Sequence, residues 1–363
     1  MLFQLMNKDS PWLLFDCYED EFGFTAGKEI EWYTSLRPIG YDNIGDFLDA
    51  RKAPKHRKHI AGLLKKYGCE STENFLRVTH ALSLNDTFWV KEPESSLSWD
   101  EVSLYRNEFD ELVSNAAFDG VISSTTLSST SPEFGTDGAY AKCWQRENDT
   151  VYLYKSGSDT YEIEPLSEFL ASQVADILCR NHVEYDLAFY HERLASKCKL
   201  FTSEKYGLVK MSTLPVPNRR NPAALLRFAA QYGSEDLMRR MFVLDALILN
   251  IDRHLGNVGF LFDNDTMRMT GMAPIYDNNR SLLFYFDTET LEKRPEWCIS
   301  KCEPKISGDF IKTAQAVLTD ELRAKLKNMA GFQFQPPVGI NVPMDRLEAL
   351  SRILNIQLNK ILQ

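Results

Sequence analysis

The stretch Asp252-Arg253-His254-Leu255-Gly256-Asn257 decides how this sequence is interpreted, because it places an aspartate and an asparagine five positions apart. The residues before it, Ser234–Asn250, have the apolar spacing that predicts an amphipathic helix. After it, Val258–Phe262 and Met267–Thr270 predict a strand hairpin. The string Ile275-Tyr276-Asp277-Asn278 then brings a second aspartate, twenty positions beyond Asn257. This order of helix, polar loop, hairpin and aspartate is more informative than any one of its parts.

The order supplies the residue types that phosphoryl transfer requires. That reaction needs a carboxylate near the attacking hydroxyl, metal ligands at the phosphates, and a lysine that holds the nucleotide. Asp252 is the candidate for the hydroxyl, and Asn257 and Asp277 are candidate ligands of Mg²⁺, which prefers oxygen atoms. The alternative is a polar turn in which Asp252 only caps the preceding helix. The surrounding elements favour the catalytic interpretation, with His254 in a supporting role.

The nucleotide-holding lysine is expected on one of two short strands upstream. These strands are predicted at Ala139–Trp144 and Val151–Ser156, with a polar turn between them. Lys155 on the second strand is the candidate contact for the α- and β-phosphates. Lys142 on the first strand remains the competing candidate, and an ordinary exposed strand lysine is the alternative for both.

A candidate phosphate loop precedes these strands, at Phe134-Gly135-Thr136-Asp137-Gly138-Ala139. Its two glycines, three positions apart, allow backbone amides to approach a phosphate closely. The string is neither GxGxxG nor a Walker motif, so a solvated polar loop stays the alternative. The Ser/Thr-rich segment 123–136 that contains its beginning is also predicted to be a loop.

Two further nucleotide contacts are predicted downstream of the strands. Pro165 opens a predicted helix whose Glu168 is the candidate ion-pair partner of the lysine, with Glu164 as the alternative. The segment Phe201-Thr202-Ser203 is the candidate hinge, whose backbone would bind adenine.

Composition limits the class of protein. The 363 residues are 44% hydrophobic and 25% charged, which is ordinary for a globular protein, and the net charge of -10 disfavours broad contact with nucleic acid. A basic cluster between Arg51 and Lys66 is interpreted as a solvated helix face. No apolar run approaches the length of a membrane span, about 18 residues. The N-terminus does not resemble a signal peptide, and the seven scattered cysteines favour a reducing, cytoplasmic compartment.

DRHLGNVGFL, at 252–261, followed by APIYDNNRSL, at 273–282, resembles the HipA-like kinases, bacterial Ser/Thr protein kinases of toxin–antitoxin systems and their stand-alone relatives. The resemblance extends upstream to SPEFGTDGAYAKCW, at 131–144, and LYKSG, at 153–157, so it covers about Ser128–Leu283. The DRHxxN motif also occurs in phosphoinositide-type lipid kinases, whereas the motif of eukaryotic protein kinases would be HRDLxxxN.

The resemblance implies an α+β, bilobal protein-kinase-like fold with a strand-rich N-lobe and a helical C-lobe. The expected division is a helix-leaning N-terminal region at 1–115, an N-lobe at 116–213 and a C-lobe at 214–363. In HipA-like kinases the loop matching 128–138 can be phosphorylated and ejected. The resemblance therefore makes four residues candidate autophosphorylation sites: Ser128, Ser129, Thr130 and Ser131.

The expected function is transfer of the γ-phosphate of ATP, with Mg²⁺, to a Ser or Thr hydroxyl of a protein. Two alternatives remain open: a small-molecule or lipid kinase, and a nucleotide-binding regulatory module of a toxin–antitoxin-type system. The expected partner is a protein substrate, with an antitoxin-like protein as a further candidate, and no membrane or direct nucleic-acid contact is expected.

Overall fold

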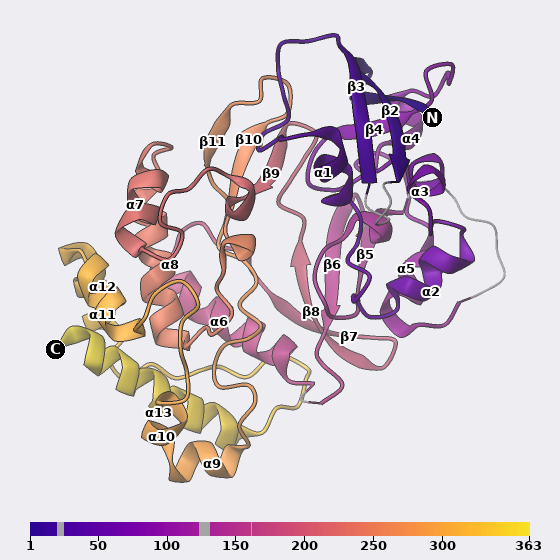
Figure 1. The fold of residues 1–363 in the computed structure, drawn as a ribbon. Coiled ribbons are helices and arrows are strands. Elements are labelled where there is room, and N and C mark those ends of the chain that lie inside the picture. Colours follow the sequence, from indigo (N-terminus) through magenta and orange to yellow (C-terminus); the bar gives the residue numbers. More distant parts are fainter. Residues whose placement is uncertain (20–24, 123–130, 161) are drawn as a thin grey trace. The chain divides into compact units, whose positions relative to one another are not determined.

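The computed structural model describes residues 1–19, 25–122, 131–160 and 162–363. The predicted phosphorylation positions 128–130 lie outside the described residues. The rest forms two compact units, each assembled from three stretches of chain (Figure 1). Unit 1 is Met1–Lys155, Lys199–Val209 and Leu261–Met269, and unit 2 is Ser156–Cys198, Lys210–Phe260 and Thr270–Gln363. The predicted division at 115 and 213 stays a prediction.

Unit 1 begins with a four-stranded antiparallel sheet of order β3-β2-β1-β4. Its strands are β1 (Leu2–Asn7), β2 (Ser10–Glu19), β3 (Thr25–Trp32) and β4 (Phe88–Lys91). Successive side chains of a strand point to opposite faces, and in β2 the alternate side chains Leu13, Phe15 and Cys17 are buried, together with Trp12 near its start. The prediction of a helix-leaning region at 1–115 missed this sheet, although the alternation is visible in the sequence.

The helices of unit 1 are short. They are α1 (Ile44–Asp49), α2 (Ile60–Lys66), α3 (Thr72–Thr79), α4 (Trp99–Val102) and α5 (Glu111–Asp119). The apolar spacing of Trp99–Asn115 predicts one helix, and this prediction is wrong, because the chain leaves the helical conformation between α4 and α5. The Asp110 side chain starts the second helix by accepting hydrogen bonds from the N–H groups of Leu112 (3.1 Å) and Val113 (3.2 Å).

Unit 1 also contains the predicted hairpin, formed by β5 (Lys142–Glu147) and β6 (Thr150–Ser156), after the short 3-10 helix η1 (Pro132–Gly135). The strands are antiparallel, and Lys142 lies directly opposite Lys155. Asn148 and Asp149 form the turn with left-handed backbones (φ 47° and 65°), as a two-residue hairpin loop requires. The hairpin prediction is confirmed, with the first strand displaced toward the C-terminus.

A buried ion pair fixes η1 on this hairpin. The Arg57 and Glu133 side chains are both fully buried and lie 2.7 Å apart. Arg57 also donates to the carbonyl oxygens of Glu133 (2.6 Å) and Lys142 (2.8 Å), and Glu133 accepts from the N–H of Trp144 (2.7 Å). The interpretation of the Arg51–Lys66 cluster as a solvated helix face is therefore wrong for this arginine, and Arg51 is likewise buried against Asp86 (2.7 Å).

Unit 2 is predominantly helical. Its helices are α6 (Glu164–Leu178), α7 (Pro222–Ala230), α8 (Glu235–Ile248), α9 (Thr288–Lys293), α10 (Pro295–Ile299), α11 (Phe310–Val317), α12 (Asp320–Asn328) and α13 (Met344–Leu362), with 3-10 turns η2 (Met211–Thr213) and η3 (Leu255–Asn257). Strand β7 (Asp186–Tyr190) pairs antiparallel with β8 (Arg193–Lys199). Strands β9 (Tyr206–Lys210), β10 (Gly259–Asp263) and β11 (Met269–Met272) include residues assigned to both units.

Helix α8 is the centre of unit 2. Every residue from Arg240 to Ile248 is buried, and α8 packs against α6, α7, α11 and α13 (Figure 1). A helix that is buried on all sides belongs to a core. The predicted helices at Asn221–Tyr232, Ser234–Asn250 and Met344–Leu362 are confirmed to within a few residues.

Two further segments differ from what their sequence predicts. The sequence of Cys198–Thr202 predicts a strand, but β8 begins earlier, at Arg193, and ends at Lys199. The aromatic run Leu283–Phe286 predicts a core strand; Leu283 and Phe284 are buried, but the backbone forms a turn. Left-handed backbones at Leu282 (φ 53°) and Leu283 (φ 55°) are incompatible with a strand. Among the described residues, no helix has the length and apolar character needed to cross a membrane.

Replacing Arg57 by Met should destabilise the protein by about 3–5 kcal/mol, because Glu133 would remain buried without its cation. Urea denaturation measures the change. The double variant Arg57→Met/Glu133→Leu should recover part of the loss, since it removes both charges. Lys55→Met, at an exposed position nearby, should change the free energy of unfolding by less than about 0.5 kcal/mol. A single Arg57→Met variant as stable as Lys55→Met would contradict this account.

Candidate functional site

The loop that carries Asp252 begins where α8 ends. Leu249 terminates the helix with a left-handed backbone (φ 53°), and the N–H of Asn250 donates to the carbonyl of Asp245 (3.0 Å). The Asn250 side chain then accepts from the N–H of Asp252 (3.0 Å). A buried helix end and a buried asparagine thus fix the backbone from which the Asp252 side chain projects.

Arg253 holds the loop through all five of its guanidinium N–H groups. The Nε group donates to the Asp245 carboxylate (3.0 Å). Nη1 donates to the carbonyl oxygens of Asn257 (2.9 Å) and Tyr276 (2.7 Å), and Nη2 donates to Asp245 (3.1 Å) and to Asn278 Oδ1 (2.6 Å). One side chain therefore joins the end of α8, the Asp252–Asn257 loop and the segment on either side of Asp277.

The Arg253–Asp245 pair is deeply buried, with side chains 3% and 6% exposed. Burial raises the pKa of Asp245, and the charge of Arg253 opposes that rise. Two backbone hydrogen bonds add to the connection: the N–H of Ile251 donates to the carbonyl of Arg280 (3.2 Å), and that of Leu282 donates to Ile248 (2.6 Å). Within unit 2, Asp252, Asn257 and Asp277 consequently belong to one hydrogen-bonded frame.

Asp277 has a left-handed backbone (φ 59°), and its N–H donates to the hydroxyl of Tyr185 (3.2 Å). Burial raises the pKa of Tyr185 well above its ordinary value, and the nearby carboxylates of Glu168 and Asp277 add to the rise. Tyr185 is therefore a neutral hydroxyl at neutral pH, and it links β7 to the predicted metal ligand. Sequence reasoning did not identify Tyr185, because it lies 92 positions before its partner.

Both candidate glutamates on α6 are buried, at 1% exposure for Glu164 and 0% for Glu168. Glu168 accepts a hydrogen bond from the Ser196 hydroxyl (2.7 Å), and Glu164 accepts from the N–H of Ser158 (3.2 Å). The choice between Glu168 and Glu164 as partner of the lysine stays a prediction.

The other predicted contacts lie in unit 1. Lys142 and Lys155 are both buried, and as directly opposed residues of an antiparallel pair they lie on the same face of the hairpin. Lys142 Nζ donates to the carbonyl of Asp137 (2.7 Å), so this lysine contacts the candidate phosphate loop itself. The two candidate lysines, Lys142 and Lys155, therefore lie side by side on one face of the hairpin.

The two loop glycines have structural explanations. Gly138 has a φ of 98°, and a Cβ atom there would lie 2.2 Å from Lys142 Nζ; a Cβ at Gly135 would lie 2.6 Å from the carbonyl oxygen of Leu82. Thr136 Oγ1 donates to the carbonyl of Pro132 (2.8 Å) and accepts from Trp144 Nε1 (2.9 Å). Close packing already accounts for both glycines, so their presence alone does not identify a phosphate site.

The candidate hinge is a turn of unit 1. The N–H of Ser203 donates to the carbonyl of Tyr206 (2.9 Å), and the Ser203 carbonyl accepts from Asn264 Nδ2 (3.1 Å). The backbone groups of Ser203 are thus already used inside the turn. Within the described part of the chain, the backbone N–H and C=O of Thr202 form no hydrogen bond, which leaves Thr202 better suited than Ser203 to bind a base.

Two cations approach Asp252. Lys305 Nζ forms an ion pair with Asp252 Oδ1, and Arg280 Nη1 lies 3.9 Å from the same oxygen. His254, beside it, accepts a hydrogen bond at Nδ1 from the N–H of Gly256 (3.1 Å). The supporting role predicted for His254 agrees with this contact. The sequence predicts that the segment from Arg280 to about Lys305 shapes the acceptor site, but it did not identify Lys305 as a partner of Asp252, from which 53 positions separate it.

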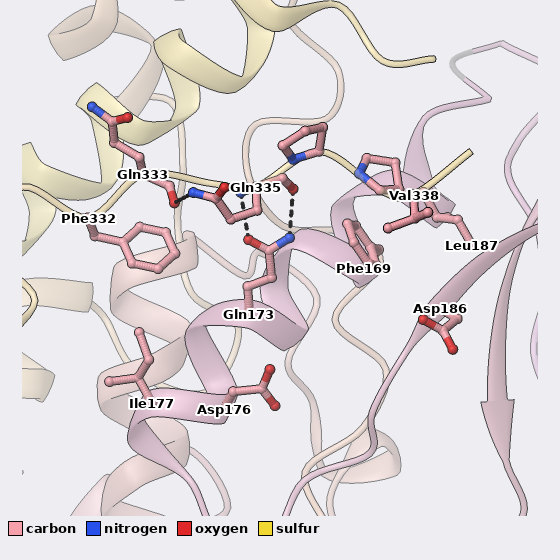
Figure 2. A pocket seen from close by; sticks show the side chains of 12 residues that line it. Phe169, Gln173, Asp176, Ile177, Asp186, Leu187, Phe332, Gln333, Gln335 and Val338 are labelled. Carbon is pink, nitrogen blue, oxygen red and sulfur yellow. Dashed lines mark hydrogen bonds between the residues drawn. The ribbon is translucent and has the colours of Figure 1, made fainter. Parts of the chain in front are cut away.

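A separate hollow of unit 2 is shown in Figure 2. It has a volume of about 540 Å³ and is lined by α6, β7 and the segment 332–338, with none of the predicted site residues in its wall. Gln173 on α6 donates to the Gln335 carbonyl (2.8 Å) and accepts from its N–H (2.9 Å), as the dashed lines in Figure 2 show.

No protein-family model matches the chain, and no curated protein sequence matches it significantly. Solved structures similar to it include the following two. One is the Helicobacter pylori proinflammatory kinase CtkA, with a TM-score of 0.50 and 20% identity over 64% of this chain and 92% of that one. The other is from the Shewanella oneidensis MR-1 toxin–antitoxin complex of HipA, HipB and operator DNA, with a TM-score of 0.53 and 12% identity over 99% and 96%. The predicted resemblance to HipA is confirmed at the level of the fold, over nearly the full length.

Arg253→Met should lower the free energy of unfolding by about 3–5 kcal/mol, because Asp245 would stay buried without a cation. Arg253→Lys should rescue little, since an ammonium cannot reproduce five donors in a planar fork. Chemical denaturation provides the measurement, and the exposed Arg227 in α7 provides the matched control Arg227→Met. An Arg253→Lys variant with the same free energy of unfolding as the wild type would contradict this account, because it would show that a positive charge alone is sufficient beside Asp245.

His254 should titrate below the ordinary histidine pKa of about 6.5, because partial burial lowers its pKa. Because the pKa of His254 is lower in the folded chain than in the unfolded chain, the unfolded chain binds the proton first as the pH decreases. The contribution of His254 to stability is therefore complete above the unfolded pKa and falls as the pH decreases through it. NMR titration of the imidazole, assigned with His254→Asn, measures the midpoint; a midpoint above the ordinary value would contradict the account.

Proposed function

We propose that this chain is a kinase that transfers the γ-phosphoryl group of ATP, with Mg²⁺, to a Ser or Thr hydroxyl of a protein. The observation that carries the proposal is the Arg253 frame, which joins the Asp252–Asn257 loop to the segment of Asp277. The frame occurs in a fold similar to two proteins described as a kinase and as the toxin HipA. The finer claims, of a bilobal kinase architecture and of Ser/Thr specificity, belong to the same proposal.

Asp252 has the role of orienting the acceptor hydroxyl and accepting its proton. Its backbone is fixed by Asn250, and its Oδ1 faces Lys305. Within the described residues, Oδ2 has no hydrogen-bond partner, so it is the oxygen that remains for an incoming hydroxyl. A carboxylate in this position acts as a general base when it lies within hydrogen-bond distance of the proton that it removes.

Asn257 and Asp277 have the role of holding Mg²⁺. The donor set fits this ion, since it offers one amide and one carboxylate oxygen. The Asn257 carboxamide has no hydrogen-bond partner in the described part of the chain, so its oxygen is free to coordinate. Among the described residues, no group of three His, Cys, Asp or Glu side chains is arranged to hold a metal ion. The ion would neutralise charge on the β- and γ-phosphate oxygens.

Lys155 is proposed to hold the α- and β-phosphates, with Lys142 as its neighbour on the hairpin and Glu168 as the acid that orients it. The loop Gly135-Thr136-Asp137-Gly138 would cover the phosphates, and Phe201–Ser203 would receive the base. In the transfer, the hydroxyl oxygen forms a bond to the γ-phosphorus while the bond to the bridging oxygen breaks. The electron pair leaves with ADP, and the hydroxyl proton passes to Asp252.

Autophosphorylation is part of the proposal, with Ser128, Ser129 and Thr130 as acceptors. Ser131 is less suitable in the conformation described here, because its side chain is buried, at 4% exposure. An antitoxin-like protein partner is proposed from the similar fold of a chain found with HipB.

Asp252→Asn should lower kcat by about 100-fold or more, the usual contribution of a positioned acid or base. Asp277→Asn should raise the Mg²⁺ concentration needed for half-maximal rate, because a charged ligand is lost. Asparagine tolerates the left-handed backbone at this position. The assay follows label from γ-³²P-ATP onto protein, alone and with cell lysate, with phosphoamino-acid analysis of the product.

Asp149→Asn is the matched control, since Asp149 is an exposed aspartate that also has a left-handed backbone (φ 65°). It should leave the rate unchanged. Label on lipid or a small molecule instead of protein would identify the alternative kinase class. Nucleotide binding without transfer to any acceptor would overturn the enzyme assignment and leave a nucleotide-binding regulatory module.

A further inference from the structure

We propose that Lys305 is a catalytic residue that bridges Asp252 and the phosphoryl group during transfer. The inference rests on the proposed kinase function and names a group that the sequence motifs do not contain. It starts from the ion pair between Lys305 Nζ and Asp252 Oδ1.

The position of Lys305 is fixed by its neighbours in the chain. Pro304 and Ile306 line a small hollow together with Asp245, Asn250 and Arg253, the residues that hold the catalytic loop. Ile306 is 5% exposed, so the backbone on either side of Lys305 is anchored in unit 2. The Lys305 side chain itself is 51% exposed, against 18% for Asp252. The lysine is therefore anchored at its base and accessible at its charged end.

The contact leaves Asp252 able to act. Both Lys305 and Arg280 approach Oδ1, while Oδ2 has no hydrogen-bond partner within the described residues. A lysine that blocked the site would be expected to occupy both oxygens or to cover the carboxylate completely. The observed arrangement instead places a cation beside the carboxylate and leaves one oxygen for the acceptor hydroxyl.

Charge explains what such a cation contributes. The Asp252 carboxylate, the attacking oxygen and the oxygens of the γ-phosphate all carry negative charge and must approach one another in the transition state. A cation already oriented at that point stabilises the developing charge without reorganisation during the reaction. Lys305 keeps its proton throughout, since the hydroxyl proton passes to Asp252. Its three N–H groups can serve Asp252 and a phosphoryl oxygen at the same time.

An interaction that is strongest in the transition state affects kcat more than substrate binding. We therefore expect Lys305→Met to lower kcat by about 100-fold, the scale found when one such donor is removed. The KM for ATP should change by less than about threefold, because Lys305 contacts bound ATP weakly before transfer. Lys305→Arg should restore part of kcat, since it returns the charge with different geometry.

The experiment measures initial rates of transfer from γ-³²P-ATP for the full-length chain, over a range of ATP concentrations. The variants are Lys305→Met, Lys305→Gln, Lys305→Arg and the control Lys312→Met, an exposed lysine of α11. Thermal melting of each variant confirms that it is folded. Lys312→Met should match the wild type in both kcat and KM.

Equal or higher activity in Lys305→Met and Lys305→Gln would overturn the inference and make the ion pair an inhibitory contact. A raised KM with unchanged kcat would also overturn it, because it would indicate ordinary ground-state binding. Failure of the wild type and of Lys312→Met to transfer phosphate to any acceptor would refute the kinase function, and the role of Lys305 with it. Phosphate transfer by the wild type that is lost in Asp252→Asn would establish the kinase function independently of Lys305. A failure of the Lys305 inference can then be told apart from a failure of the kinase function.

Discussion

The ion pair between Arg253 and Asp245 is the interaction on which the rest of the candidate site depends. It lies at the end of the most deeply buried helix of unit 2, where an unpaired charge would be costly. The remaining N–H groups of the arginine donate hydrogen bonds to the carbonyl oxygens of Asn257 and Tyr276 and to the side chain of Asn278. Because the buried charge of Asp245 requires Arg253 beside it, the same arginine also fixes the backbone of two loops that are distant in sequence.

Unit 1 uses the same physical solution. Arg57 is paired with Glu133 inside the unit and donates its other hydrogen bonds to the backbone carbonyl groups of Glu133, of Thr136 in the candidate phosphate loop and of Lys142 in β5. In each unit a loop without regular structure of its own is held by a guanidinium that satisfies several carbonyl groups at once. Such loops need this support, because their backbone polar groups have no helix or sheet to bond to. The rigidity of the loops therefore comes from buried arginines rather than from glycines.

The sequence predicted what depends on local pattern. The helical periodicity of Ser234–Asn250 and the hairpin turn at Asn148 and Asp149 were recognisable because both signals lie within a few residues. The DRHxxN wording indicated the family to which the fold is similar. The N-terminal sheet was missed although β2 shows alternation; its strands β1, β2 and β3 are neighbours in the chain, and only β4, which pairs with β1, lies far along it. Tyr185 and Lys305 could not be found from the sequence, since nothing local marks a residue that meets its partner across 92 or 53 positions.

The five hydrogen bonds of Arg253 bear on how the DRHLGN string should be used to compare proteins. Every donor of this arginine is directed at the protein's own backbone and side chains, so a related chain without catalytic activity would still need it in order to fold. Conservation of the arginine across a set of homologues would accordingly report on folding. On the proposed function, the joint retention of Asp252, Asn257 and Asp277 would instead report on turnover.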